Sequence, residues 1–232
     1  MRFRELAFKG GLSLYRMGPA ERGGTVAVLF HGGAWVGGHP VGLREMCRFL
    51  AGYKVGAFSA QYRMLPRGSV TIVHEAIVDA RDAVAFVARA QRPERLFVVG
   101  ASSGGLLAIH AACARPELVS GVVLFNPLVN LAANNLASLP RGLVADVSPL
   151  TMSIAQFPRT LVLQGGKDEV TPAIFARRFV ARLRAIGTEA QIGFFPEAGH
   201  GFYLPQPYRG GTFAQMRDFM LGKPAERAAA AD

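Results

Sequence analysis

The stretch Leu96-Phe97-Val98-Val99-Gly100-Ala101-Ser102-Ser103-Gly104-Gly105 decides how the rest of the chain is interpreted. Its first four residues are apolar and two are β-branched, which is typical of a buried strand. From Gly104 the sequence reads Gly-Gly-Leu-Leu-Ala-Ile, which predicts a helix that begins at once. A serine in so sharp a strand-to-helix turn has the Gly-x-Ser-x-Gly pattern of a nucleophile elbow. With 27 glycines in 232 residues the pattern also arises by chance, so its context must decide.

A second glycine-rich turn follows an upstream strand. The apolar run Thr25–Phe30 predicts a buried strand, and His31-Gly32-Gly33-Ala34-Trp35 comes directly after it. Acyl transfer through a tetrahedral intermediate needs hydrogen-bond donors for the developing oxyanion, and glycine amides approach it without obstruction. A glycine turn at a strand end is by itself equally consistent with a purely structural role. Its pairing with the serine elbow favours an oxyanion-binding loop.

The serine elbow and the His-Gly-Gly-Ala-Trp loop together resemble those of the α/β-hydrolase superfamily. Within it, they are similar to the hormone-sensitive-lipase, acetylesterase and arylformamidase-like carboxylesterases. The resemblance extends from Val26 to about Tyr203. It implies an α/β-hydrolase fold, with a mostly parallel central sheet, helices on both faces and a minimal cap. It also implies an oxyanion hole formed by the amides of Gly33, Ala34 and Ser103.

Candidates for the acid and the base of a catalytic triad follow two later strands. The run Thr160–Gln164 leads into a loop with Asp168, and the run Ala190–Phe195 leads into a loop with His200. Parallel strands collect ligands and chemistry at their carboxyl ends. Serine, acid and histidine also follow one another in the order of an α/β-hydrolase. The resemblance therefore implies Ser102, Asp168 and His200 as the triad, and its spacing favours Asp168 over the neighbouring Glu169.

Substrate contacts are indicated less strongly than the triad. Trp35, Leu128, Leu136 and Phe202 are candidates to line an acyl pocket, and plain core packing explains each of them equally well. Because the N-terminal part is short, only Asn126–Pro158 is available to cover the site. We therefore expect a shallow pocket that favours small acyl groups such as acetyl or butyryl.

The four other histidines are assigned no catalytic role. We expect His31 to hold the oxyanion loop by a hydrogen bond. His39 is interpreted as a solvated loop residue, with a place in the pocket as the alternative. His74 and His110 lie on predicted helices. Since no histidines or cysteines have a metal-binding spacing, neither a metal nor another cofactor is implied.

The rest of the chain predicts alternating strands and helices, which indicates a mostly parallel sheet covered on both faces. The expected strands are Glu5–Phe8, Leu12–Arg16, Val26–Phe30, Val55–Tyr62, Leu96–Val99, Val122–Phe125, Leu161–Gln164 and Gln191–Phe195. The expected helices are Leu43–Leu50, Val73–Ala90, Gly104–Ile109, Ala173–Ile186 and Phe213–Leu221. We predict a single domain over residues 1–222 and a frayed tail over 223–232.

The formal net charge of +10 raises the question of nucleic-acid binding. The arginines are dispersed over predicted helices, and no basic tract alternates with aromatic residues as in a nucleic-acid groove. Apolar runs are far shorter than the ~20 residues of a membrane span, and no signal-peptide pattern follows Met1. Cys47 and Cys113 are expected to be reduced core thiols. We therefore expect a cytoplasmic protein with no nucleic-acid or membrane partner, and leave a homodimer open.

These patterns predict a serine carboxylesterase that hydrolyses short-chain, acetyl-like esters through an acyl-enzyme. The chain departs from the resembled family at four positions. Gln61 replaces an acidic residue and Ala34 replaces the third glycine. Ala101 stands where many members have Asp or His, and Ser103 stands where they have Ala. The departures remove no catalytic group, but they leave the subfamily open. An arylformamidase-type amide hydrolase is one alternative. A non-catalytic small-molecule binder on the same fold is another, although such proteins usually lose the histidine.

Overall fold

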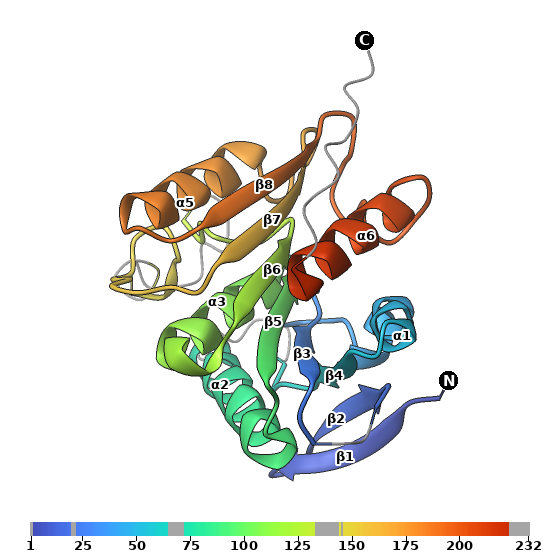
Figure 1. The fold of residues 1–232 in the computed structure, drawn as a ribbon. Helices are drawn as coiled ribbons and strands as arrows, with labels where there is room; N and C mark the ends of the chain where they lie inside the picture. Colours follow the sequence, from blue (N-terminus) through green and yellow to red (C-terminus); the bar gives the residue numbers. More distant parts are fainter. Residues whose placement is uncertain (1, 20–21, 65–71, 133–143, 145, 223–232) are drawn as a thin grey trace.

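The computed structural model describes residues 2–19, 22–64, 72–132, 144 and 146–222. Within these residues an eight-stranded sheet crosses the molecule in the order β1-β2-β4-β3-β5-β6-β7-β8 (Figure 1). Its strands are β1 (Arg4–Lys9), β2 (Leu12–Met17), β3 (Thr25–Phe30), β4 (Gly56–Ala60), β5 (Arg95–Ala101), β6 (Gly121–Phe125), β7 (Thr160–Gly165) and β8 (Ala190–Phe195).

The sheet is mostly parallel, as the sequence predicts. Six strands run parallel to one another, in the order β4, β3, β5, β6, β7 and β8. The other two are antiparallel: β1 pairs with β2, and β2 pairs with β4. The register places Val28 of β3 and Val122 of β6 on either side of Val98 in β5. The carboxyl ends of the parallel strands therefore lie along one edge, where such sheets bind ligands.

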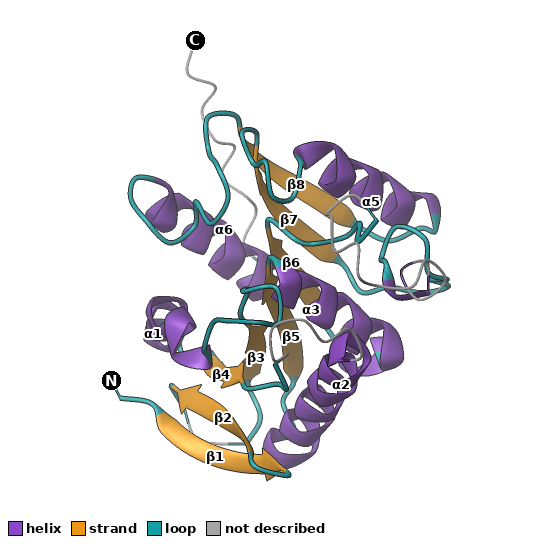
Figure 2. Ribbon diagram, turned by 180° about the vertical axis from the view of Figure 1, so that it is seen from behind, coloured by secondary structure: helices purple, strands orange, loops and turns teal. Residues whose placement is uncertain are grey.

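Helices cover both faces of the sheet (Figure 2). The structure describes the bounds of η1 (Pro40–Leu43), α1 (Arg44–Gly52), α2 (Ile72–Gln91), α3 (Ser103–Ala114), η2 (Pro116–Leu118), α5 (Ala173–Ala185) and α6 (Tyr208–Leu221). Helices α1 and α6 pack on one face, in a core cluster with Phe97 and Val99. Helices α2, α3 and α5 pack on the other face, in a cluster with Leu96 and Val98. Because β5 is buried on both faces, its apolar run is continuous rather than alternating.

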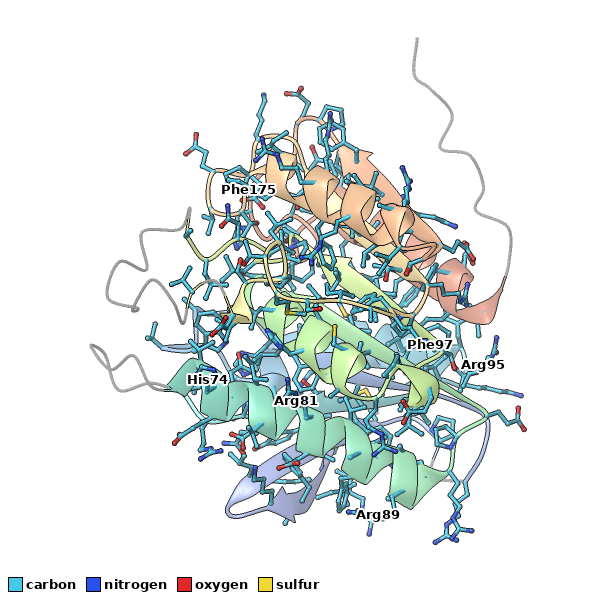
Figure 3. All side chains as sticks on the ribbon, turned by 90° about the vertical axis from the view of Figure 1, so that its left-hand side faces the viewer. His74, Arg81, Arg89, Arg95, Phe97 and Phe175 are labelled. Carbon is cyan, nitrogen blue, oxygen red and sulfur yellow. The ribbon has the colours of Figure 1, made fainter. Side chains whose placement is uncertain are left out.

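Helix α2 carries two arginines. Figure 3 labels Arg81 and Arg89 on α2, and both residues are exposed.

Helix α2 also carries a buried carboxylate, Asp79, which accepts hydrogen bonds from Lys9 at 2.9 Å and from Arg63 at 2.8 Å. Burial opposes ionisation of Asp79, but the hydrogen bonds from Arg63 and Lys9 outweigh it and lower its pKa. These two ion pairs join β1 and the loop after β4 to α2.

Some expected elements have different ends in the structure. The expected strand Val55–Tyr62 is shorter, since β4 covers only Gly56–Ala60, and the expected helix Gly104–Ile109 runs on to Ala114. The expected helix Phe213–Leu221 begins earlier, at Tyr208, although two glycines in its first turn favour a loop. The expected tail, 223–232, lies outside the described residues, as does most of 133–145 within the expected cover.

Candidate active site

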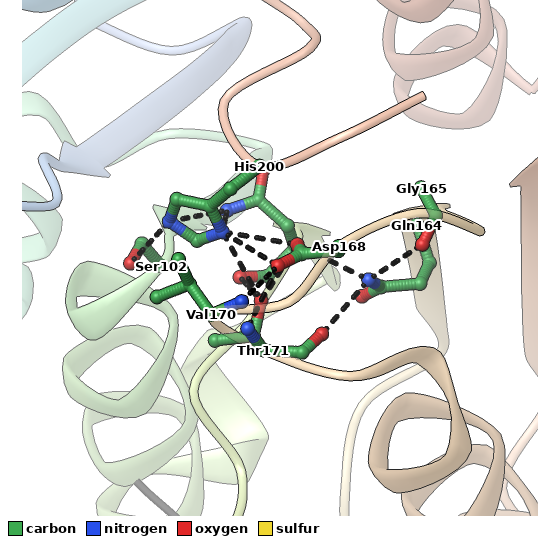
Figure 4. Close-up of polar contacts among 8 residues, drawn as sticks. Ser102, Gln164, Gly165, Asp168, Val170, Thr171 and His200 are labelled. Atoms are coloured by element: carbon green, nitrogen blue, oxygen red, sulfur yellow. Dashed lines mark hydrogen bonds and ion pairs between the residues drawn. The ribbon is translucent and has the colours of Figure 1, made fainter. Parts of the chain in front are cut away.

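Three residues predicted from the sequence meet at the carboxyl edge of the sheet (Figure 4). Ser102 lies between β5 and α3, Asp168 lies in the loop after β7, and His200 lies in the loop after β8. The parallel strands bring these loops together, although Ser102 and His200 are 98 positions apart. The fold therefore assembles the three residues, which the sequence places far from one another.

A chain of hydrogen bonds joins the three side chains. The Nε2 atom of His200 lies 3.1 Å from Oγ of Ser102, and its Nδ1 atom lies 2.9 Å from Oδ2 of Asp168. A carboxylate only accepts hydrogen bonds, so Nδ1 carries the ring proton of the neutral histidine. Nε2 is then free to accept the proton of the Ser102 hydroxyl. The three side chains are thus connected in the order that hydrolysis by an activated serine would require.

The backbone around Ser102 forms a strained elbow that its neighbours hold in place. Ser102 has φ 52° and ψ −122°, which a residue with a side chain rarely adopts. Its amide donates to the carbonyl of Phe125 at 3.0 Å, and its carbonyl accepts from the amides of Gly105 and Leu128, both at 2.9 Å. Because both backbone groups are paired, the side chain is presented at a defined position above the sheet edge.

The helix after the elbow packs directly on the end of β3. A Cβ atom at Gly104 would lie 2.3 Å from the carbonyl oxygens of both Phe30 and His31, so only glycine fits there. The loop after β3 in turn reaches the nucleophile, since a Cβ atom at Gly32 would lie 3.0 Å from Cβ of Ser102. The glycines of the two motifs thus allow the predicted oxyanion loop and the serine elbow to lie side by side.

A comparison with models of protein families matches residues 27–144 to a family described as "alpha/beta hydrolase fold". The matched residues make up about half of the chain and contain both the glycine-rich loop and the serine elbow. The chain belongs to this α/β-hydrolase family. Asp168 and His200 lie outside the matched residues, so their assignment depends on the geometry of the site.

Relatives of this α/β-hydrolase include proteins named as esterases. The carboxylesterase/phospholipase LipF of Mycobacterium tuberculosis is 26% identical over 224 residues, which cover 81% of this chain and 58% of LipF. The solved structure of apo Thermogutta terrifontis esterase 2 has a TM-score of 0.81 and 25% identity, covering 95% of this chain and 94% of that one. The butyrate-bound form of that esterase has a TM-score of 0.77 and 24% identity, covering 97% and 96%. The chain thus spans a little over half the length of LipF.

The carboxylate of Asp168 in this α/β-hydrolase is held by its own loop. The amides of Val170 and Thr171 donate to Oδ1 at 3.0 and 2.7 Å, and the Thr171 hydroxyl donates to Oδ2 at 2.8 Å. Burial opposes ionisation, but hydrogen bonds from His200 and Thr171 outweigh it and lower the pKa of Asp168. The carboxylate of Asp168 is therefore ionised at neutral pH.

The loop after β3 makes a tight turn that strains two residues without glycine's freedom. The amides of Val36 and Gly37 both donate to the carbonyl of Gly33, at 3.1 and 3.0 Å. Ala34 and Trp35, which lie between Gly33 and Val36, have φ angles of 51° and 61°, in the left-handed region. This region costs a residue with a side chain roughly 1–2 kcal/mol. Surrounding contacts must therefore hold the loop in its conformation.

The three predicted oxyanion donors are not equivalent in the structure. The amide of Ala34 donates to Oγ of Ser103 at 2.9 Å, and its place in the oxyanion hole stays a prediction. The amides of Gly33 and Ser103 make no hydrogen bond with any described residue. The family resemblance misses the difference because its members usually have alanine, which has no hydroxyl, where Ser103 lies.

His31 holds the oxyanion loop by hydrogen bonds, as expected. Its Nδ1 atom donates to the carbonyl of Gly32 at 2.7 Å, and the Tyr62 hydroxyl donates to the carbonyl of His31 at 2.8 Å. The two aromatic rings are stacked, with their centroids 4.5 Å apart. Burial lowers the pKa of His31, so the ring remains neutral and keeps this arrangement at neutral pH.

Three of the four apolar residues predicted to contact substrate are buried. Trp35 is 1% exposed, and it packs in the same core cluster as Leu128. Phe202 packs in the other cluster, where its ring contacts those of Phe195 and Tyr208. Their role in substrate binding stays a prediction, since core packing accounts for these contacts. Leu136, the fourth candidate, lies outside the described residues.

Two residues of the site were missed by the sequence analysis. Asn126 is fully buried, and its Nδ2 atom lies 3.4 and 3.5 Å from the two ring nitrogens of His200. The hydroxyl of Thr171 contacts Asp168 and also lies 3.3 Å from Nδ1 of His200. Both carry a signal that sequence reasoning can use: Asn126 directly follows a predicted strand, and Thr171 comes three positions after the acid in an Asp-x-x-Thr turn.

Among the described residues, no group of three or more His, Cys, Asp or Glu side chains is placed to hold a metal ion. None of the helices that the structure describes has the length and apolar composition to cross a membrane. Cys47 and Cys113 are free, and burial raises the pKa of each thiol to about 12. His39 is exposed, and its Nδ1 atom accepts from the Val41 amide.

Proposed function

We propose that this α/β-hydrolase is a serine carboxylesterase that acts on short-chain acyl esters. The observation that carries the proposal is the hydrogen-bonded chain from Ser102 through His200 to Asp168. A non-catalytic binder on this fold would have no need for a histidine placed between a strained serine and an ionised acid. The esterase names of relatives with the same fold support the same reaction class.

The first half of the reaction transfers the acyl group to the enzyme. Oγ of Ser102 attacks the ester carbonyl carbon while Nε2 of His200 takes the hydroxyl proton. The carbonyl oxygen becomes an oxyanion that accepts hydrogen bonds from the free amides of Gly33 and Ser103. Asp168 stabilises the imidazolium. The bond to the alkoxy oxygen then breaks, His200 gives its proton to the departing alcohol, and the acyl group stays on Ser102.

The second half returns the enzyme to its starting state. A water molecule gives a proton to Nε2 of His200 as its oxygen attacks the acyl carbon. The second tetrahedral intermediate collapses, the bond from the acyl carbon to Oγ of Ser102 breaks, and the proton on His200 returns to Oγ. The products are a carboxylic acid and the free enzyme.

The preference for short acyl groups is supported by the burial of the candidate pocket residues. Trp35, Leu128 and Phe202 are each less than 5% exposed, so these three side chains offer little apolar surface to a long acyl chain. Thermogutta terrifontis esterase 2, which has a similar fold, has been solved with butyrate bound. A four-carbon acid is of the size that a shallow pocket accommodates.

Labelling with a fluorophosphonate tests the nucleophile and its activation in one experiment. Wild-type protein is incubated with the probe, the labelled peptide is mapped by mass spectrometry, and hydrolysis of p-nitrophenyl acetate is measured in parallel. We expect the label on Ser102, with loss of label and turnover in Ser102→Ala and retention of both in the control Ser120→Ala. A label on Ser103, or turnover in Ser102→Ala near the wild-type rate, contradicts the proposal.

A second substrate distinguishes the ester hydrolase from the amide hydrolase that the sequence leaves open. N-formylkynurenine and p-nitrophenyl acetate are compared by their kcat/KM values with the same enzyme preparation. We expect the ester to be preferred. A kcat/KM for N-formylkynurenine well above that for the ester assigns the protein to the arylformamidase type instead.

A further inference from the structure

We propose that the hydroxyl of Ser103 is a positioning group for the oxyanion hole. It holds loop 33–35 in the left-handed conformation that presents the Gly33 amide to the substrate. This inference rests on the proposed function and adds a role for a side chain that the reaction itself does not consume. It concerns the hydroxyl of Ser103 and is separate from the role of the Ser103 amide as a donor.

The contact that carries the inference joins two segments that are distant in the sequence. The amide of Ala34 donates to Oγ of Ser103 at 2.9 Å, across a separation of 69 positions. Ser103 is 1% exposed, whereas Ala34 is an exposed residue of the loop. The hydrogen bond therefore fastens a surface loop to a buried side chain. The acceptor is buried, so this hydrogen bond is partly shielded from water.

The loop needs such a fastening because its conformation is disfavoured. Ala34 and Trp35 lie one after the other in the left-handed region, which residues with side chains rarely adopt. Burial in the core holds Trp35. Packing cannot hold the exposed Ala34 in the same way, and its amide hydrogen bond to Ser103 adds to the two turn hydrogen bonds on the Gly33 carbonyl in opposing its return to an ordinary conformation.

The position of Ser103 makes the fastening useful for catalysis. Ser103 is the first residue of α3, and the next residue, Gly104, packs directly on the end of β3. Its own amide is one free donor of the hole, and Gly33, which precedes Ala34, supplies the other. One hydrogen bond thus fixes the separation of the two donors. An oxyanion hole stabilises its intermediate only when its donors are positioned before the reaction.

A double-mutant cycle tests this role, because glycine at position 34 adopts the left-handed conformation without strain. The effect of Ser103→Ala on kcat and KM for p-nitrophenyl acetate is measured in wild type and in the Ala34→Gly background. We expect kcat to fall about tenfold in wild type with KM nearly unchanged, and less than about threefold in the Ala34→Gly background. Ser103→Thr, which keeps the hydroxyl, should recover most of the loss. Equal losses in both backgrounds, or no loss in wild type, overturn the inference.

Melting temperatures are measured first, and Ser103→Cys replaces Ser103→Ala if that variant is unfolded. The thiol is of similar shape but is a weak hydrogen-bond acceptor. Amide hydrogen exchange gives a readout that does not depend on activity. We expect the Ala34 amide to be protected in wild type and to exchange at least tenfold faster in Ser103→Ala. Unchanged exchange overturns the inference, whereas a wild-type protein without esterase activity or label on Ser102 contradicts only the proposed function.

Discussion

The hydroxyl of Thr171 donates a 2.8 Å hydrogen bond to Oδ2 of Asp168. Thr171→Val removes this donor while keeping the branched shape of the side chain. The hydrogen bond from Thr171 stabilises the ionised carboxylate, so its removal should raise the pKa of Asp168. We expect kcat to fall about tenfold as a result. Thr188→Val is the matched control, since that hydroxyl donates to the carbonyl of Phe157 instead. Equal effects of the two substitutions on kcat contradict a role for Thr171 in holding the acid.

The triad should act as one unit. Ser102→Ala and His200→Ala are each expected to lower kcat by at least about a thousandfold, and the double variant by little more, because either change already removes the activated nucleophile. The exposed His74 on α2 provides a control, His74→Ala, which should keep wild-type kcat. Steady-state kinetics with p-nitrophenyl acetate measure all four variants. Multiplicative losses in the double variant contradict the assignment.

The buried ion pairs of Asp79 should make stability depend on pH. Its folded pKa is lowered, so its contribution is present above its unfolded pKa of ~3.9 and is lost as pH falls through the folded value. We expect Asp79→Asn to reduce the free energy of unfolding by about 1–3 kcal/mol at pH 7, and by less near pH 3. Urea unfolding at both pH values measures this difference. The control Asp82→Asn, at a half-exposed carboxylate, should cost under about 1 kcal/mol. A loss for Asp79→Asn that is the same at pH 7 and pH 3 speaks against the ion pairs as its cause.

The close contact at Gly104 should make this helix position intolerant of a methyl group. Gly104→Ala places a Cβ atom 2.3 Å from two carbonyl oxygens at the end of β3, so we expect a loss of stability of about 1–3 kcal/mol. Gly210 also lies in a helix, but nothing is within 4 Å of the Cβ position there. Gly210→Ala should therefore stabilise the protein, by up to ~1 kcal/mol. Thermal unfolding of the two variants compares them, and equal effects contradict the steric explanation.

The length of the acyl chain tests the expected pocket. Each methylene buried in a pocket contributes about 0.8 kcal/mol, or nearly fourfold in kcat/KM, whereas a methylene beyond the end of the pocket contributes nothing. We expect kcat/KM for p-nitrophenyl esters to peak at two to four acyl carbons and to fall by eight. Substrates are assayed below their micelle concentrations. A maximum at ten or more carbons shows a long acyl tunnel and rules out the short-chain preference.

The order of strands and helices was predictable because it depends on local patterns. The apolar run before Ser102 is continuous because β5 is buried on both faces. The glycine loop and the loop with Asp168 follow similar buried strands, whereas the loop with His200 follows β8, a partly exposed strand at the edge of the sheet. The extra turn at the start of α6 was not predictable. Its glycines disfavour a helix, and packing of Phe213 and Met216 in the core outweighs that preference.

Local sequence patterns were enough to identify the residues available for chemistry and the edge of the parallel sheet at which they lie. Which atoms meet there depends on the folded chain, as for the Ala34 amide with the Ser103 hydroxyl and for Asn126 with the ring of His200. These contacts join loops from different strands, and they depend on backbone strain and side-chain rotamers that no local pattern specifies. Hydrogen bonds change from present to absent within a few tenths of an ångström, whereas the burial that sets strand order tolerates much larger shifts.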